Sequence, residues 1–136
     1  MKRLIIACAL LLSSALFADT IQSRTNDIQI SADSADKNVD RLYYNFGTIP
    51  QGSMSYVNYY VTNVGERPLF FREARLSGPG YFARHNCGGV LPPRGGRCTF
   101  TIEFAPYYQG YYTGQFMMAF DQYTVIVDLA GQAYQY

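Results

Sequence analysis

The stretch that decides the fold is NCGGVLPPRGGRCTFTIEFAP, residues 86–106. Two cysteines, Cys87 and Cys98, lie on either side of a loop of glycines and prolines, and an alternating run follows directly. The apolar residues of one parity in that run are Phe100, Ile102 and Phe104. An apolar residue at every second position is typical of a β-strand with one buried face. The stretch therefore predicts a loop that leads into a half-buried strand.

Short alternating runs continue along the chain from Leu42 onward. We expect strands near residues 42–47, 54–63, 68–77, 80–84, 97–105, 111–121 and 123–131. Turn signals rich in Gly, Pro and Asn separate these runs, and none of them has the 3.6-residue period of an amphipathic helix. The inward faces should also hold Val57, Tyr59, Val61, Phe116, Met118, Phe120, Val125, Val127 and Leu129. The sequence predicts an all-β domain over residues 41–136, an antiparallel β-sandwich of about seven strands.

The amino terminus predicts export from the cytoplasm. A positively charged start, an apolar run over residues 4–12 and small residues up to Ala18 form the pattern of a secretory signal peptide, residues 1–18. Cleavage is expected after Ala15 or Ala18. No later segment approaches the about 20 apolar residues that a membrane helix needs. We therefore expect no transmembrane segment after signal removal, and a protein that reaches the periplasm, the cell surface or the medium.

Signal removal changes the cysteine count. Cys8 would leave with the signal, and it lies too close to the start to mark a lipoprotein. Cys87 and Cys98 then remain as the one pair, and an even count in an oxidising compartment favours a disulfide. A metal site or a redox thiol would be the functional alternatives, but there is no C-x-x-C spacing and His85 is the single histidine. We predict a structural disulfide, no metal and no cofactor.

Residues 19–40 differ from the rest of the chain in composition. They are rich in Ser, Asp, Asn and Thr, which predicts a flexible arm, with a weak strand as an option at residues 28–30. Asp33, Asp36 and Asp40 lack the order and the final glutamate of a calcium loop, so we interpret them as solvated linker residues.

Charge and candidate catalytic residues exclude two large classes of function. The formal net charge is +1 and the arginines are scattered, so no basic stripe is available for nucleic acid. The one histidine, His85, is two residues from a cysteine assigned to a bridge, and a nucleophile needs a nearby base. Glu103, Asp121 and Asp128 fall on faces or turns expected to meet solvent, where carboxylates are common. We predict that the protein is not an enzyme.

Tyrosine is the unusual component of the composition, with 13 copies. Several fall at positions predicted to face outward: Tyr56, Tyr60, Tyr107, Tyr108, Tyr111, Tyr134 and Tyr136. The first five are the candidate partner-binding residues, since tyrosine offers a large rigid contact area with a polar tip. Two alternatives stay open. Tyrosine is also favoured in sheets for packing alone, and its rings could stack on sugars.

The order of several motifs resembles a known family. FGTIPQGS, VTNVGERPL, SGPGYF, CGGVLPPRGGRCTFTIEFAP, YYQGYYTGQF and VDLAGQA follow one another over residues 42–131. Together they resemble bacterial immunoglobulin-like domains related to Hydin-type (ASH) and major-sperm-protein modules, also described as choice-of-anchor D domains. The resemblance implies a seven-stranded sandwich with Phe46 and Gly47 opening the first strand, Asn63 and Gly65 in a turn, and Cys87 bonded to Cys98.

Such modules bind or support other proteins and are usually not enzymes. We therefore predict a noncatalytic secreted or periplasmic module that mediates protein–protein interaction, as a subunit or adaptor of a cell-envelope or surface assembly. The alternative is a carbohydrate-binding, adhesin-like module that uses its surface tyrosines.

Overall fold

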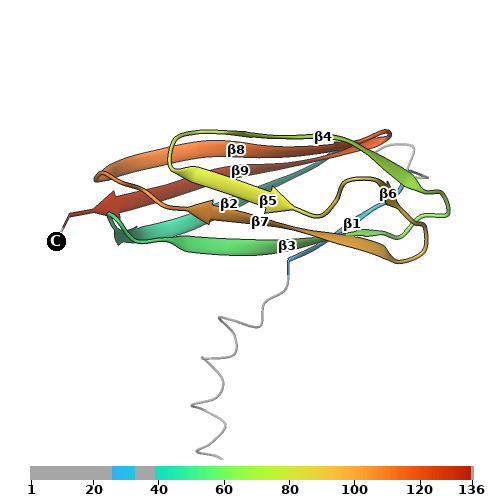
Figure 1. Ribbon diagram of the computed structural model, residues 1–136, viewed down its shortest axis with the longest axis horizontal. Helices are drawn as coiled ribbons and strands as arrows, with labels where there is room; N and C mark the ends of the chain where they lie inside the picture. The colour runs from blue at the N-terminus through green and yellow to red at the C-terminus, as the bar shows by residue number, and fades with distance from the viewer. Residues whose placement is uncertain (1–25, 33–38, 136) are drawn as a thin grey trace, which may run out of the picture.

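Two β-sheets pack face to face, and the alternating apolar residues of the sequence lie between them (Figure 1). The computed structural model describes residues 26–32 and 39–135. Within these ranges the chain forms strands and no helix: β1 (Asp27–Ile30), β2 (Val39–Pro50), β3 (Ser55–Asn63), β4 (Leu69–Ser77), β5 (Tyr81–His85), β6 (Val90–Leu91), β7 (Gly96–Phe104), β8 (Gly110–Phe120) and β9 (Tyr123–Tyr134). The predicted signal peptide lies outside the described residues.

One sheet has the strand order β1-β3-β7-β5 and the other has the order β2-β9-β8-β4-β6. The predicted all-β sandwich is confirmed, with β1 and the short β6 added to the seven expected strands. Most strand pairs are antiparallel, as expected, and two edge pairs are parallel, since β1 runs parallel to β3 and β2 runs parallel to β9. Neither pair is joined by a hairpin, so the connection does not impose the antiparallel direction.

The residues predicted to face inward are buried between the sheets. Aromatic rings connect the two layers. Phe100 of β7 stacks on Tyr59 of β3 in its own sheet, with ring centroids 5.1 Å apart, and on Phe116 of β8 in the opposite sheet, at 4.7 Å. Stacked pairs of this kind add stability beyond the apolar area that they bury. The sequence alternation thus identified the core correctly.

Strand β1 occupies part of the segment expected to be a flexible arm. Ile28 and Ile30 are 6% and 1% exposed, and the hydroxyl of Thr62 donates a hydrogen bond of 2.8 Å to the Asp27 carboxylate. Burial of two isoleucines attaches residues 27–30 to the sheet, and β1 is the strand that the sequence left open within the expected arm. Asp33 and Asp36 lie outside the described residues.

Strand β2 contains an irregularity at its centre. Its register against β9 shifts between Asn45 and Thr48, and Gly47 has a φ of 78°, a left-handed conformation that favours glycine. The side chain of Asn45 accepts the Gly47 N–H at 2.8 Å. Phe46 and Gly47 therefore form a bulge within a strand that begins at Val39, whereas the resemblance implied that they open the strand.

Candidate functional site

Three segments meet at the end of the sandwich that holds the carboxyl terminus: the β2–β3 turn, the β7–β8 loop and the end of β9 (Figure 1). Backbone hydrogen bonds of 2.8 Å join them, from Gln51 N–H to the Tyr134 carbonyl and from Gly52 N–H to the Pro106 carbonyl. Four of the predicted binding residues belong to this end, namely Tyr56, Tyr107, Tyr108 and Tyr111. We call this end of the sandwich, which presents these four residues, the tyrosine end.

Three rings of the tyrosine end are the most exposed aromatic side chains among the described residues, and the fourth is also exposed. Tyr107 and Tyr108 are 80% and 75% exposed, Tyr111 is 69% exposed and Tyr56 is 59% exposed. The hydroxyl of Tyr112 accepts the Tyr108 N–H at 3.3 Å and donates to the Tyr108 carbonyl at 2.7 Å. These two hydrogen bonds hold the backbone of the β7–β8 loop in place while its tyrosine rings face solvent. A surface held in place before binding loses less conformational entropy when a partner docks.

The loops of the tyrosine end carry no formal charge, and the nearest charged residue in the β3–β7 register is Glu103, which lies opposite Tyr56 and pairs with Arg84. The described segments that meet there are residues 47–56, 78–83, 104–111 and 129–135, and none contains Asp, Glu, Lys or Arg. The other polar groups in these segments are backbone, Ser, Thr and Gln, and Met54 and Phe82 are exposed apolar side chains. A composition of Tyr, Ser and Gly with amide side chains is typical of antibody binding loops, which combine rigid aromatic contacts with adaptable hydrogen bonds.

Tyr60 does not join the other four candidates. It faces outward on β3, like Tyr56, but lies roughly 13 Å further along the strand, at about 3.3 Å per residue. The guanidinium of Arg97 lies over its ring, 5.2 Å from the centroid, and Arg97 also pairs with Asp27 at 3.5 Å. The ring of Tyr60 is therefore partly covered and engaged in a cation–π contact.

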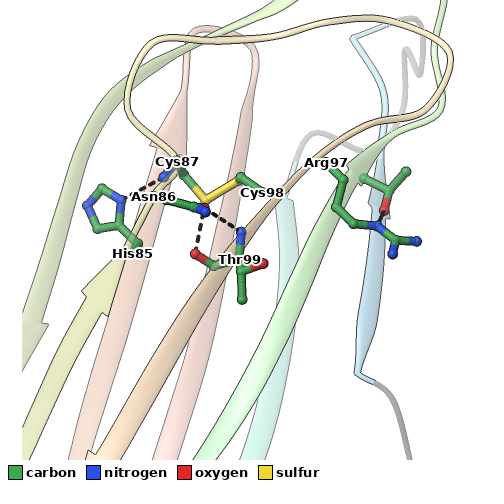
Figure 2. The surroundings of a disulfide bond; sticks show 7 residues. His85, Asn86, Cys87, Arg97, Cys98 and Thr99 are labelled. Atoms are coloured by element: carbon green, nitrogen blue, oxygen red, sulfur yellow. Dashed lines mark hydrogen bonds between the residues drawn. A yellow bond between two sulfur atoms is a disulfide. The ribbon is translucent and has the colours of Figure 1, made fainter.

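The opposite end of the sandwich contains the disulfide (Figure 2). Cys87 and Cys98 are bonded, with their Cα atoms 5.1 Å apart. Beside the bond, the Cys87 N–H donates to Nδ1 of His85 at 3.0 Å, and the Thr99 N–H donates to the Asn86 side chain at 2.8 Å. These bonds fix the loop from both sides. The cysteines serve as a covalent link, as the sequence predicted.

Asn63 organises this disulfide end, and its role was not evident from the sequence. Its side chain is fully buried, accepts the Gly65 N–H at 3.0 Å, and donates to the carbonyls of Arg67 at 2.8 Å and Leu91 at 3.0 Å. The turn implied by the family resemblance is present. The extra bonds join that turn to β6, which belongs to the other sheet.

The titratable groups suggested as catalytic candidates are held in local contacts. Glu103 is paired with Arg84, and Asp128 accepts hydrogen bonds from Gln115 at 3.0 Å and Arg41 at 2.9 Å. These hydrogen bonds, with Gln115 as the larger contributor, hold the pKa of the Asp128 carboxyl below its usual value.

Residues 26–32 and 39–135 contain no group of three or more His, Cys, Asp or Glu side chains placed to bind a metal ion. They also contain no helix that is long and apolar enough to cross a membrane.

The family model described as HYDIN/CFA65/VesB-like, Ig-like domain matches residues 35–132. Among solved structures, the VesB protease of Vibrio cholerae aligns with a TM-score of 0.60 and 14% identity, over 68% of this chain and 30% of VesB. The secreted serine protease VesC of Vibrio cholerae gives 0.52 and 17%, over 65% of this chain and 21% of VesC. The ASH/PapD-like domain 7 of human CEP192 gives 0.54 and 19%, over 71% and 83%.

The alignments with the two proteases cover less than a third of either protease chain. Identities this low indicate a shared fold and nothing about activity. Among curated proteins, none matches the sequence significantly.

Proposed function

This chain belongs to the HYDIN/CFA65/VesB-like Ig-like domain family, and from that membership we propose that it is a noncatalytic module that binds another protein. We propose further that it is exported and acts as a subunit or adaptor of a cell-envelope or surface assembly. The observation that carries the proposal is the tyrosine end, where four exposed rings lie on hydrogen-bonded segments without a charged residue.

The exposed area is of the size that protein interfaces use. A fully exposed aromatic side chain presents about 150–250 Å², so four rings that are 59% to 80% exposed present on the order of 500 Å². One partner in a standard interface contributes about 800 Å². Tyrosine is also enriched at interface centres, where a few aromatic residues provide most of the affinity. The tyrosine end could therefore form the larger part of one interface.

Export is supported by two features of the chain. The amino-terminal pattern predicts a signal peptide, and the Cys87–Cys98 disulfide requires an oxidising compartment to persist. An adaptor in such a compartment would be exposed to other envelope or secreted proteins, which are the partners we propose.

Co-isolation from native envelopes tests the proposal. Tagged wild-type chain should recover a reproducible partner, and the triple variant Tyr56→Ser, Tyr107→Ser, Tyr108→Ser should lose it while folding normally. Phe70→Ser is the control, since Phe70 is 47% exposed and lies on β4 opposite Val90 of β6, at the disulfide end. Equal recovery by wild type and triple variant would refute the binding role of these rings. Retention on a glycan array, lost in the same variant, would instead support the carbohydrate-binding alternative.

A further inference from the structure

The free edges of the two sheets differ in how they are protected. An exposed edge strand can pair with another chain, and proteins usually block such edges with charges, prolines or bulges. Strand β2 has the bulge at Gly47 and ends at Pro50, and β5 carries Arg84 and His85. Strand β4, beyond its short pairing with β6, carries Arg72, Glu73 and Arg75 and a register shift.

The edge of β3 lacks these devices over residues 55–59. Strand β1 pairs with β3 only from Tyr60 to Asn63. The residues before that point read SYVNY and contain no charge, no proline and no register shift against β7. Among the described residues, this segment is therefore an edge with none of the devices that block pairing with a neighbouring strand.

The hydrogen bonds around Asn26 show where the pairing with β1 stops. The Tyr60 N–H donates to the Asn26 carbonyl at 2.9 Å, but the Asn58 carbonyl receives the Asn26 side-chain amide at 3.0 Å in place of a backbone N–H. Alternate residues of a strand direct their backbone groups to the same edge, so the N–H of Asn58 and both groups of Tyr56 point outward. In the described part of the chain no partner for these three groups is observed.

The side chains around this edge define the chemistry of a partner. On the inward side, Tyr59 is buried and the partly buried Tyr44 of β2 meets it edge-on, with ring centroids 6.4 Å apart. On the outward side, Tyr56 is exposed. A strand beside β3 would place apolar side chains toward Tyr44 and uncharged side chains beside Tyr56, where cross-strand pairs with aromatic rings are favourable.

We infer that the β3 edge over residues 55–59 is a docking site for an extended, uncharged strand of a partner protein, which continues the sheet past the end of β1. The inference rests on the proposed protein-binding function and names the mode of binding. Backbone hydrogen bonds provide affinity in strand addition, and the alternating side chains provide selectivity. Tyr56 then belongs both to this edge and to the tyrosine end, so one partner can contact both.

A titration of the isotope-labelled chain with a synthetic peptide tests this site by NMR. The probe is a ten-residue peptide of alternating threonine and valine, and the control is the same peptide with N-methyl groups at alternate residues, which cannot pair with an edge. We expect the unmethylated peptide to shift the amide signals of Tyr56 and Asn58 and to slow their hydrogen exchange about tenfold or more. The methylated peptide should do neither.

Two variants at one position isolate the backbone contribution. Asn58→Pro removes an N–H that points away from β7, so the β3–β7 ladder keeps its bonds while the edge is blocked. Asn58→Ala loses the same side-chain bond with Thr101 but keeps the N–H. Peptide binding should persist in Asn58→Ala and disappear in Asn58→Pro. The two-peptide comparison on the wild-type chain decides the question if the proline variant does not fold.

The inference is overturned if the peptide leaves Tyr56 and Asn58 unchanged, if its effects are confined to β5 or β2, or if the methylated peptide acts equally. These outcomes can be told apart from failure of the proposed function. A partner that co-isolates through the tyrosine end, with no peptide effect on the edge, removes the strand-addition mode alone. If the edge binds the peptide but the chain recovers no partner, the proposed function is refuted and the strand-addition site is not.

Discussion

The two ends of the sandwich differ in how their loops are held together and in how exposed and charged their side chains are. At the disulfide end, a covalent bond, the buried Asn63 and an ion pair of 3.0 Å between Arg94 and Glu66 hold the loops together. At the tyrosine end, backbone hydrogen bonds and the Tyr112 hydroxyl position loops whose side chains are exposed and uncharged. The difference indicates that one end supplies stability and that the other is free to be used for contact.

This division predicts that equal changes have unequal effects at the two ends. Substitutions at the disulfide end should lower the free energy of unfolding and leave any binding specificity unchanged. Substitutions at the tyrosine end should weaken binding and leave the free energy of unfolding nearly unchanged.

Asn63→Ala should lower stability more than any other polar substitution at the disulfide end. It leaves the buried Gly65 N–H and the Leu91 carbonyl without their side-chain partner, and each unsatisfied buried group costs about 1–3 kcal/mol. We expect a loss of about 4 kcal/mol in the free energy of unfolding, measured by urea denaturation.

Asn45→Ala is the control for this change. Asn45 accepts the Gly47 N–H in the same local arrangement, but it is exposed to solvent. Water can replace its hydrogen bond, so the loss should stay under about 1 kcal/mol. Similar losses in the two variants would show that burial of Asn63 contributes little.

Replacement of Cys87 and Cys98 by serine should cost somewhat less. The bond closes a loop with a sequence separation of 11 residues. A cross-link of this length restricts the unfolded chain and so stabilises the folded state by about 3 kcal/mol. Thermal unfolding should show a lowered Tm with partner binding retained below it. Thiol labelling of unfolded, unreduced wild-type protein should find neither cysteine reactive. Two labelled sites would show that the bond does not form in the wild-type protein.

The sequence predicted the features that depend on neighbouring residues and missed those that depend on distant ones. Alternation is local, so seven strands and their buried faces followed from it directly. The attachment of β1 depends on where β3 lies in space, and the polar composition around Ile28 and Ile30 favoured an arm instead. Asn63 likewise reads as a turn residue, because nothing near it in the sequence indicates that its amide reaches Leu91.

The candidate site was predicted in part for the same reason. Strand parity placed Tyr56 and Tyr60 on the outward face, and turn composition placed Tyr107 and Tyr108 in a loop. That Tyr56 lies at the same end as this loop follows from the β3–β7 register, which the sequence does not state. The contact of Arg97 with Tyr60 arises from the same pairing and separates Tyr60 from the others.

Buried tyrosines should make stability sensitive to alkaline pH. Burial raises the pKa of Tyr59, Tyr81 and Tyr123 to about 12, above the ordinary value of 10.0. Their folded pKa is the higher one, so their contribution is complete below pH 10 and is lost as the pH rises from 10 toward 12. Tm should fall across this window. Tyr59→Phe should weaken the pH dependence because one ionisable hydroxyl is gone, and an unchanged slope would contradict this assignment.

The smallest effect on stability and the clearest on binding should come from Tyr107→Ser with Tyr108→Ser. Both rings are exposed, and Tyr112 holds the backbone of Tyr108, not its ring, so the loop keeps its hydrogen bonds. The free energy of unfolding should change by less than about 0.5 kcal/mol. Affinity for the co-isolated partner should fall by about 2 kcal/mol for each ring that acts as an anchor.

Tyr112→Phe tests whether the loop must also be held in place. It removes the hydroxyl that bonds to Tyr108 and leaves every exposed ring of the tyrosine end present. If the fixed loop contributes to recognition, this variant should bind more weakly than wild type and more tightly than the double variant, because the partner must then order the loop as it docks. Affinity equal to wild type would mean that the exposed rings are enough for binding and that the loop need not be held in place. The two ends of the sandwich would then differ only in how exposed their side chains are.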